Sequence, residues 1–245
     1  MISWPAGYGL IEFDEIDSTN EEARRLAAKG ERGPVWIVAG RQTAGRGRRG
    51  RKWESPAGNL AATLLLNPEK PASECAQISF VSALAASDAI ARFTPDAEIK
   101  VKWPNDVLAN GRKIAGILLE SASQGANPQF LIAGIGMNLK SHPIETEFPA
   151  ISLSGLGLSP PLPRHALLEL AVPFAKWYDV WHAEGFSPIR DAWLSRAAGL
   201  GTRIRARLTN EETVGIFEGI DETGALLLRE AQDRVRTIAA GEVFF

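Results

Sequence analysis

The chain has 245 residues, and 45% of its side chains are hydrophobic, which is enough to build one large domain, or a medium domain and a small one. A net charge of −2 excludes a polycation whose whole surface seeks nucleic acid, and the single cysteine, Cys75, excludes an internal disulfide. The first residues lack the basic and apolar regions of a signal peptide, and no run of ~18 apolar residues predicts a membrane helix. We therefore expect a soluble, cytoplasmic protein with no membrane partner.

The first elements are predicted to be a strand, a helix and two further strands. Ser18 and Thr19 each precede a glutamate by three positions, which is the capping-box pattern at the start of a helix. Gly30 is a typical residue to follow the end of that helix. The short apolar runs at 35–40 and 60–66 predict strands.

A long segment, residues 41–59, separates these two predicted strands. It has little periodicity, and loops of this length in a compact domain are usually functional or disordered. Its centre, GRGRRGRK at 45–52, carries five cationic side chains and no acid. A flexible loop that binds an anion is one interpretation of this density of charge on a backbone rich in glycine.

The middle of the chain predicts one helix followed by antiparallel strands. Residues 73–93 place apolar side chains at helical spacing, and residues 99–103 alternate apolar side chains with lysines, as a strand does. Asn110-Gly111 lies between two apolar runs and is the strongest short signal for a hairpin. Glycines within the apolar run at 130–139 mark places where another group can approach the backbone of a strand.

The last part of the chain changes character after Ala198. Residues 164–184 and 188–198 predict two helices, whereas the rest contains short strands separated by turn residues. A β module of about 45 residues is too small to be very stable alone. We therefore divide the chain into a domain at 1–198 and a small all-β domain at 199–245 that docks on it.

Several interpretations of the basic loop compete. Gly45, Gly47 and Gly50 have the spacing of a dinucleotide fingerprint, but the loop continues into a strand where that fingerprint needs a helix. A solvated charged loop or a nucleic-acid patch would also be rich in arginine. Trp53 follows directly, and an indole beside guanidinium groups suits a nucleotide, with phosphates on the arginines and the base on the ring. An ordinary core role for Trp53 stays open.

A second polar cluster is predicted at one end of the sheet. Lys102, Asn105 and Asp106 lie at the end of a strand, where Pro104 prevents further pairing, and the hairpin turn folds Lys113 back toward them. A lysine, an amide and a carboxylate together could hold a phosphate, a magnesium ion and an incoming amine. The alternative is a surface hairpin with a solvated salt bridge. The three histidines are scattered and predict no zinc site.

Three stretches taken in order resemble the biotin protein ligases: STN at 18–20, GRGRRGRKWESPAGNL at 45–60 and KWPNDVLANGRKIAGILLE at 102–120. GIGMN at 134–138 is similar to the strand that follows in this family, and the terminal β module resembles the family's C-terminal domain. The resemblance implies an α/β (α+β) fold. Its parts would be a mixed, mainly antiparallel sheet flanked by helices and a small C-terminal β-barrel.

The resemblance also implies an ATP-dependent, AMP-forming ligase. The carboxylate of biotin would attack the α-phosphate of ATP to give biotinyl-5′-AMP, and a lysine of a biotin carboxyl carrier domain would then accept the biotin. Both steps bring anions together, so fixed cations are required, and the basic loop would wrap the adenylate. Mg²⁺ would be carried by ATP, near Asn105, and the protein itself would have no metal site.

The resemblance assigns one set of residues to biotin. Ser18, Thr19 and Gln42 would bind the polar ureido end. The residues implied at the carboxylate end are Gly45, Arg46 and Gly47. Gly116 would form part of the pocket wall.

A second set of residues is implied on the nucleotide side, namely Arg48, Arg49, Trp53, Asn105, Lys113 and Asn138. Arg48 would clamp the phosphates of the adenylate, and Trp53 would stack on adenine. Lys113 would stabilise charge in both transition states. Asp106 would receive or orient the incoming lysine amine, with general-base catalysis as one role. The implied catalytic residues are therefore Lys113, Arg48 and Asp106.

The resemblance implies a carrier protein or domain of an acyl-CoA carboxylase as the partner, and it leaves a homodimer open. STN begins only 17 residues from the first residue, so we expect no DNA-binding domain and no DNA partner. The alternatives are a lipoate or octanoate–protein ligase of related fold, or a nucleic-acid-binding module. An octanoyl transferase would need a nucleophilic cysteine, whereas Cys75 is predicted to be a core residue of a helix.

Overall fold

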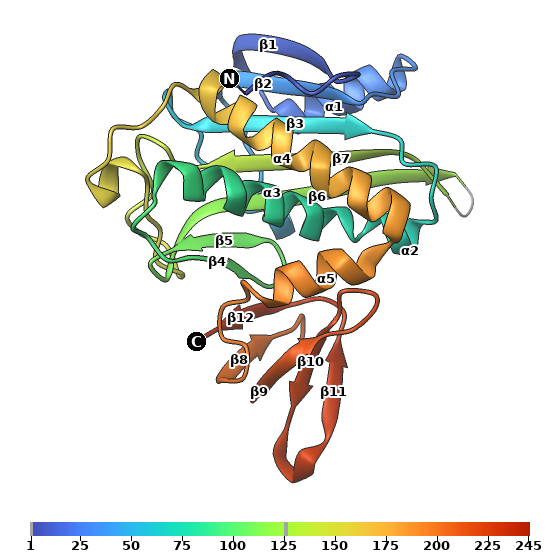
Figure 1. Ribbon diagram of the computed structural model, residues 1–245, viewed down its shortest axis with the longest axis vertical. Helices are drawn as coiled ribbons and strands as arrows, with labels where there is room; N and C mark the ends of the chain where they lie inside the picture. Colours follow the sequence, from blue (N-terminus) through green and yellow to red (C-terminus); the bar gives the residue numbers. More distant parts are fainter. Residues whose placement is uncertain (1, 125–126) are drawn as a thin grey trace.

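The computed structural model describes residues 2–124 and 127–245, which form a large and a small β-sheet (Figure 1). The strands of the large sheet, in spatial order, are β1 (Gly9–Ile16), β2 (Val35–Gln42), β3 (Leu60–Leu66), β7 (Asn127–Met137), β6 (Arg112–Gln124), β5 (Asp106–Ala109) and β4 (Ile99–Lys102). β1 and β2 are parallel, and every other neighbouring pair is antiparallel. The predicted mixed, mainly antiparallel sheet is confirmed.

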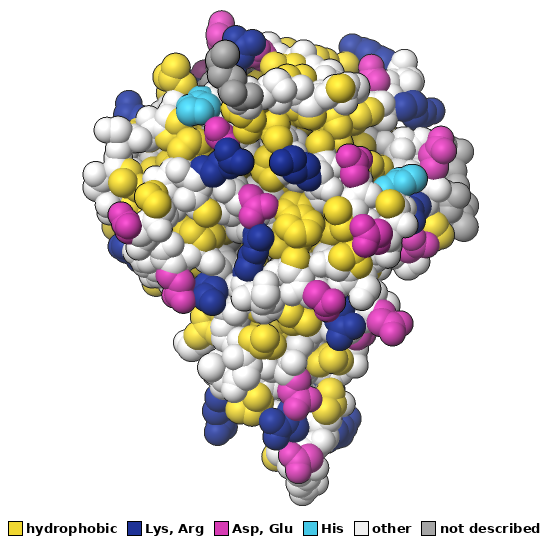
Figure 2. Space-filling model, viewed as in Figure 1, with side chains coloured by type: hydrophobic (Ala, Val, Ile, Leu, Met, Phe, Trp, Pro, Cys, Tyr) yellow, Lys and Arg dark blue, Asp and Glu magenta, His cyan; other side chains and the backbone are white. Residues whose placement is uncertain are grey.

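Helices cover the two faces of this sheet unequally. The helices are α1 (Thr19–Ala28), α2 (Ala72–Cys75), α3 (Ile78–Phe93), α4 (Pro163–Glu184) and α5 (Phe186–Leu194). In β2, Trp36 and Val38 belong to the large core with α3 and α4, whereas Val35 and Ile37 pack in a small core with Ala23 of α1. Because α1 has only 10 residues, it covers part of its face and leaves room for a site there. Figure 2 shows the opposite, helical face, where charged side chains of both signs are interspersed with apolar ones.

The C-terminal sheet is formed by β8 (Arg203–Arg207), β9 (Glu212–Ile220), β10 (Leu226–Arg229), β11 (Val235–Ile238) and β12 (Glu242–Phe244). Its order is β11-β10-β9-β8-β12, and all pairs are antiparallel. No pairing between β11 and β12 closes it within the described residues, so the predicted barrel is an open sheet. The short strands predicted after residue 198 are present, and the last two, β11 and β12, have only four and three residues.

The two sheets share one hydrophobic core. Ile204, Phe217 and Val243 of the small sheet belong to the same buried cluster as α3 and the large sheet. The indole Nε1 of Trp103, at the end of β4, donates a hydrogen bond to the carbonyl of Gly224 at 3.0 Å. This docking places β12 beside the polar end of β4.

The local structure around the predicted site follows the sequence in part. Asn110 and Gly111 both adopt positive φ angles, of 48° and 72°, so they form the hairpin turn between β5 and β6 as predicted. The capping box was wrong, because Ser18 precedes α1 but makes no side-chain hydrogen bond to it. The predicted helix at 73–93 is divided into α2 and α3. No helix of the described residues combines the length and apolar character needed to span a membrane.

Candidate active site

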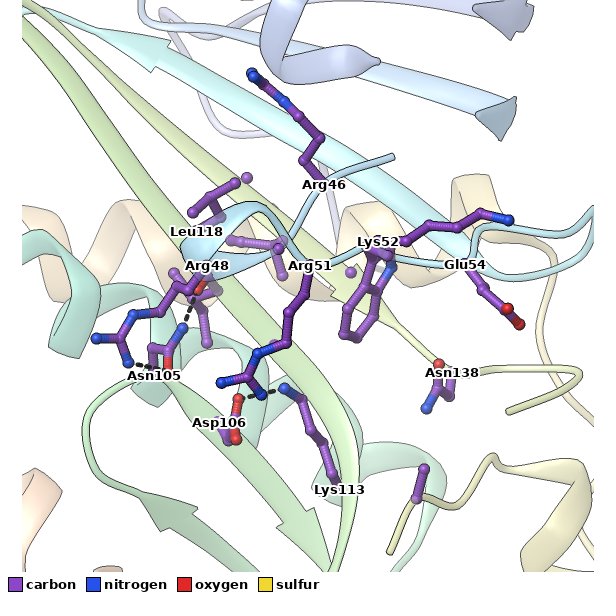
Figure 3. Close-up of a pocket in the computed structure, with 18 of the residues that line it drawn as sticks. Arg46, Arg48, Arg51, Lys52, Glu54, Asn105, Asp106, Lys113, Leu118 and Asn138 are labelled. Atoms are coloured by element: carbon purple, nitrogen blue, oxygen red, sulfur yellow. Dashed lines mark hydrogen bonds and ion pairs between the residues drawn. The ribbon is translucent and has the colours of Figure 1, made fainter. Parts of the chain in front are cut away.

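A cavity of about 470 Å³ lies on the α1 face of the large sheet, a volume within the usual range for small-molecule sites (Figure 3). Its floor comes from β3, β6 and β7, and one wall comes from the basic loop at 45–52 together with Trp53 and Glu54. The β4–β5 connection, the segment at 143–150 and β12 complete it. Segments far apart in the sequence therefore meet around one space.

Glycines in the floor allow side chains to lie directly on the sheet. A Cβ at Gly136 would overlap the indole of Trp53, and one at Gly134 would overlap the amide of Asn20. A Cβ at Gly116 would come within 3.1 Å of both Trp53 and Lys113. The predicted close approach to the strand backbone is confirmed, and Trp53 is fixed between the basic loop and the floor.

One end of the cavity is uncharged and polar. Ser18 and Thr19 are buried at the start of α1 and reach the cavity together with Gln42. The backbone N–H of Thr19 donates to Gln42 Oε1 at 2.8 Å, and Gln42 Nε2 donates to Ser55 Oγ at 2.8 Å. Ser18 has no capping hydrogen bond, so its hydroxyl is free to face the cavity rather than the helix.

The opposite end holds a carboxylate between two ammonium groups. Asp106 Oδ1 lies 2.6 Å from Lys113 Nζ, and Asp106 Oδ2 lies 3.5 Å from Lys102 Nζ (Figure 3). Burial would raise the pKa of Asp106, but Lys113 and Lys102 hold that pKa below its usual value. Burial lowers the pKa of Lys102, whose ammonium lies 4.1 Å from the ring centre of Phe148. With both lysines and the aspartate in their charged forms, the cluster would carry one net positive charge, at the end predicted to meet phosphates.

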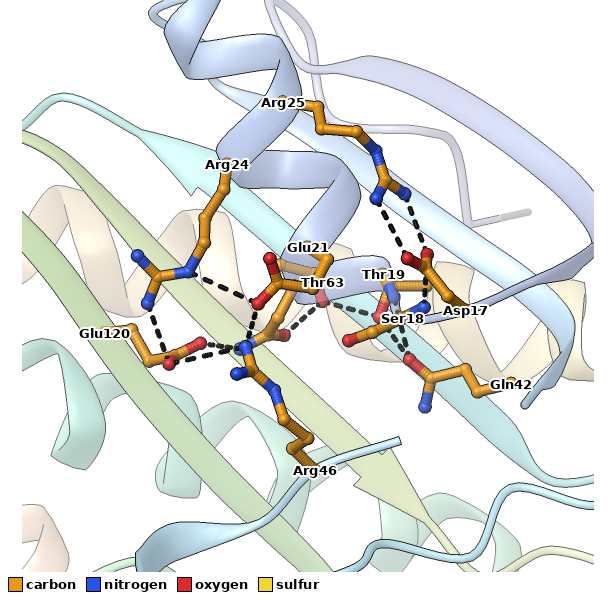
Figure 4. A network of polar contacts seen from close by, with 11 residues as sticks. Asp17, Ser18, Thr19, Glu21, Arg24, Arg25, Gln42, Arg46, Thr63 and Glu120 are labelled. Atoms are coloured by element: carbon orange, nitrogen blue, oxygen red, sulfur yellow. Dashed lines mark hydrogen bonds and ion pairs between the residues drawn. The ribbon is translucent and has the colours of Figure 1, made fainter. Parts of the chain in front are cut away.

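The basic loop is held at both ends by other parts of the chain. Arg48 Nη1 donates to Asn105 Oδ1 and to the carbonyl of Gly241, both at 3.3 Å, and Arg51 forms an ion pair with Glu242 of β12. Burial lowers the pKa of Arg48. On the other side, the guanidinium of Arg46 is paired with Glu21 of α1, lies 3.8 Å from Glu120 of β6 and points away from the cavity (Figures 3 and 4).

Most of the predicted site residues line this cavity: Ser18, Thr19, Gln42, Arg46, Gly47, Arg48, Trp53, Asn105, Asp106, Lys113, Gly116 and Asn138. Two lie outside its wall. Gly45 is buried against the carbonyl of Trp53, and its own carbonyl accepts a hydrogen bond from the Trp53 N–H at 3.0 Å. Arg49 is exposed, with a positive φ of 55°. Because neither residue lines the cavity, their contacts with a ligand remain predictions.

Sequence reasoning missed several residues of the wall, namely Arg51, Phe148, Glu242 and Phe244. Lys102 was placed in the polar cluster but assigned no role, because the alternation of β4 put it on the polar face. It is instead 5% exposed, under Phe148. Glu242 and Phe244 had no local signal, since only the docking of β12 brings them near the basic loop.

The residues present fit magnesium that is bound mainly through phosphates. No group of three or more His, Cys, Asp or Glu side chains that could hold a metal occurs in residues 2–124 and 127–245. Both oxygens of Asp106 face lysines, and the Oδ1 of Asn105 accepts from Arg48. Magnesium commonly keeps its waters and binds the phosphates of a nucleotide with few protein ligands.

Comparison with known proteins agrees with this geometry. The model of the "Biotin/lipoate A/B protein ligase family" matches residues 12–138, and that of the "Biotin protein ligase C terminal domain" matches residues 199–245. The chain is 49% identical to a biotin–[acetyl-CoA-carboxylase] ligase of Paracoccus denitrificans over 235 residues, which is 94% of this chain and 97% of the relative. It is 34% identical to the bifunctional ligase/repressor BirA of Bacillus subtilis, over 97% of this chain and 74% of the relative.

Solved structures give the same result. The chain superposes on a biotin protein ligase from Aquifex aeolicus, solved in complex with biotin and ATP, with a TM-score of 0.83 and 29% identity. That match covers 96% of this chain and 97% of the Aquifex chain.

Proposed function

The chain belongs to the biotin/lipoate A/B protein ligase family, and we propose that it is a biotin–protein ligase. It activates biotin with ATP to biotinyl-5′-AMP and transfers the biotin to a lysine of a carrier protein. The observation that carries this proposal is the distribution of charge along one cavity. An uncharged hydrogen-bonding end, at Thr19 and Gln42, is continuous with a cationic end at Lys113 and Arg48.

In the first step, a carboxylate oxygen of biotin forms a bond to the α-phosphorus of ATP while the bond to pyrophosphate breaks. Both reactants are anions, so the barrier falls when fixed cations lie where the negative charge develops. Lys113 and Lys102, with Asp106 between them, supply such charge without moving. Arg48, held by Asn105 and Gly241, would clamp the phosphates in a dry site. Magnesium that arrives with ATP would shield further phosphate charge.

In the second step, the amine of the carrier lysine attacks the carbonyl carbon of the mixed anhydride, AMP leaves, and the proton that the amine loses passes to water. A carboxylate whose pKa is held low is a weak base, so Asp106 is better suited to orient the amine than to take its proton. Apart from the ion pair with Lys113, the Oδ1 atom accepts no other hydrogen bond from the described residues. This oxygen keeps a lone pair for a further donor, but it is buried, so the amine would reach it only by displacing the groups that cover it.

The lipoate and octanoate alternatives are less well supported. The C-terminal match is to a domain described for biotin protein ligases, and it covers β8 to β12. Cys75 is buried in α2, its thiol donates to the carbonyl of Lys70 at 3.3 Å, and it does not line the cavity. A nucleic-acid patch fits poorly as well, because Arg46 and Arg51 are engaged by acids of the same chain.

We expect the acceptor to be the carrier protein or domain of an acyl-CoA carboxylase, as the name of the Paracoccus relative indicates for that protein. A homodimer remains a prediction that light scattering can test.

The adenylation step can be tested without a carrier. Biotin-dependent exchange of labelled pyrophosphate into ATP isolates this step, and lipoate and octanoate provide the comparison. Exchange with biotin alone is the expected result. Exchange with lipoate or octanoate alone would contradict the proposed substrate, and no exchange with any acid would contradict an adenylating ligase.

A further inference from the structure

A buried asparagine, Asn59, lies at the point where β3 and β7 stop pairing. The last paired residues are Leu60 of β3 and Met137 of β7. Asn59 is 4% exposed, and it stands behind the wall of the cavity rather than in it. Its Oδ1 atom accepts hydrogen bonds from the backbone N–H groups of residues 139–141, at 3.1, 2.9 and 3.1 Å, and its Nδ2 atom donates to the carbonyl of Ser141 at 2.9 Å. One side chain therefore fixes the course of the chain as it leaves β7.

The residues that follow β7 cover the cationic end of the cavity. We call residues 139–150 the covering segment. Asn138, directly before this segment, lines the cavity (Figure 3), and so do Thr146 and Phe148 within it. The ring centre of Phe148 lies 4.1 Å from the ammonium nitrogen of Lys102. The position of the covering segment therefore decides what a ligand meets at this end.

Backbone hydrogen bonds also join both ends of the covering segment to β6. The N–H of Lys113 donates to the carbonyl of Pro149 at 2.8 Å, and the N–H of Ile151 donates to the carbonyl of Lys113 at 2.9 Å. The N–H of Asn138 donates to the carbonyl of Ile114 at 2.8 Å. A shift at the start of the segment would therefore act beside Lys113, the lysine expected to stabilise phosphate charge.

The start of the segment needs an acceptor that the sheet cannot supply. Because β3 begins at Leu60, residues 139–141 lie beyond the strand that pairs with β7. Their N–H groups are buried or partly buried, and such donors are costly to leave without a partner. The carbonyl of Asn59 accepts from them without bringing a negative charge near the place expected for phosphates.

We propose that Asn59 is a positioning residue for the nucleotide: it holds the start of the covering segment and so keeps Asn138 and Phe148 in place at the cationic end of the cavity. This inference rests on the proposed function, because it takes that end to bind ATP. The effect should be confined to ATP, since Thr19 and Gln42 at the biotin end are held by other hydrogen bonds.

Asn59→Ala removes the acceptor and the donor together. In biotin-dependent pyrophosphate exchange, we expect the KM for ATP to rise about tenfold, which corresponds to the net loss of one hydrogen bond, while the KM for biotin stays unchanged. A purely structural role would lower the melting temperature and the amount of active protein but would leave both KM values as they are in the wild type.

Asn67→Ala is the matched control. Asn67 directly follows the other end of β3, and its Oδ1 atom accepts one hydrogen bond, from the N–H of Glu69 at 3.3 Å, away from the cavity. Truncating this asparagine should change neither KM value.

The placement of the covering segment can also be measured without any substrate. Lys140 is exposed, but its N–H is held by Asn59, so the lysine-specific protease Lys-C can cut after Lys140 only when the start of the segment opens. Intact mass identifies this cut by the fragments 1–140 and 141–245. Asn59→Ala should be cut here about tenfold faster than the wild type, and Asn67→Ala at the wild-type rate.

Asn59→Asp is a milder variant for the case in which Asn59→Ala does not fold. It keeps the accepting oxygen and the side-chain volume and loses only the donor to Ser141. Its cleavage rate after Lys140 and its KM for ATP should lie between those of the wild type and those expected for Asn59→Ala. Wild-type values of both quantities would contradict the proposal.

The outcomes separate the two proposals. A higher KM for ATP together with faster cleavage in Asn59→Ala supports the inference. An unchanged KM for ATP, an equal rise in the KM for biotin, or cleavage at the wild-type rate would overturn it while leaving the ligase intact. A wild-type protein that does not exchange pyrophosphate with biotin would overturn the proposed function itself, and the cleavage rates would still report whether Asn59 holds the segment.

Discussion

At the scale of single residues, the site depends on placing two lysines against one aspartate. Lys102 is buried, and Asp106 is the acid that compensates it, while Lys113 binds the other oxygen of the same carboxylate. Removing the acid would leave two like charges a short distance apart in a site shielded from water. Removing Lys113 would leave the acid paired with Lys102 but would take away the charge closest to the cavity. The two substitutions should therefore fail in different ways.

Lys113→Ala should reduce catalysis while the protein stays folded. Because fixed charge aimed at a transition state is worth roughly 10²- to 10³-fold in kcat, we expect a loss of that size in biotin-dependent pyrophosphate exchange. Lys100→Ala is the control, since Lys100 lies on the same sheet but outside the cavity. Equal rates for Lys113→Ala and the wild type would remove Lys113 from the mechanism.

Asp106→Asn should reduce stability in a way that depends on pH. The pKa of Asp106 is lowered in the folded state, so ionisation stabilises the fold above the ordinary carboxyl value of about 4, and this contribution fades as the pH falls toward the folded-state pKa. At pH 7 the loss of one partner of a buried ion pair should cost about 3 kcal/mol in the free energy of unfolding. Urea unfolding should show this difference shrinking below pH 4. A difference that is constant with pH would mean that Asp106 is not ionised in the folded protein.

At the scale of elements, two ion pairs tie the basic loop, residues 45–52, to other parts of the chain. Arg46 is paired with Glu21 of α1 and Arg51 with Glu242 of β12, and Gly47 and Arg48 between them line the cavity. The glycines of the loop allow it to move, and the two ion pairs hold it in the position seen in the structure. Retention of the reactive biotinyl-5′-AMP would depend on how long the loop stays closed over the cavity.

Arg48→Gly should shorten the retention of biotinyl-5′-AMP by about tenfold, the effect of losing a charge-assisted hydrogen bond to a phosphate. The released adenylate should then label proteins other than the carrier. Arg49→Gly is the comparison, because Arg49 is exposed and its positive φ suits glycine. Gel-filtration decay of labelled adenylate measures retention, and strict carrier specificity in Arg48→Gly would contradict the clamp.

The glycine content of the basic loop supports a separate prediction, namely that the adenylate orders this loop. Trypsin should cut the loop at 45–52 more slowly when biotin and ATP are present. Cleavage at the same rate with and without both ligands would show that ligand binding does not order the loop.

The elements also show what the sequence could reveal. The Asn110-Gly111 turn has a local signal and so predicts that Lys113 returns to Asp106, which the structure confirms at 2.6 Å. The capping prediction at Ser18 was wrong, because the sequence before a helix is the same whether the hydroxyl caps the helix or faces a cavity. Glu242 was out of reach, since no local pattern in three residues of β12 reveals which loop they will contact.

At the scale of the whole molecule, the small sheet completes the site and shares the core of the large one. Trp103 is 2% exposed and joins β4 to Gly224, and Phe217 and Val243 pack into the common cluster. The division at residue 198 remains a prediction, and the shared packing favours one cooperative unit. Calorimetry of the full chain should show a single unfolding transition. Two separated transitions would mean that the sheets unfold independently.

The most direct test of the function is the intact mass of a biotin-accepting carrier domain after incubation with this protein and Mg-ATP. Biotin, lipoate and octanoate would be offered separately, with Lys113→Ala run in parallel. We expect one added biotin per carrier, dependent on ATP, and none with Lys113→Ala. Addition of lipoate or octanoate in place of biotin would contradict the substrate, and no addition of any acid would contradict the ligase itself.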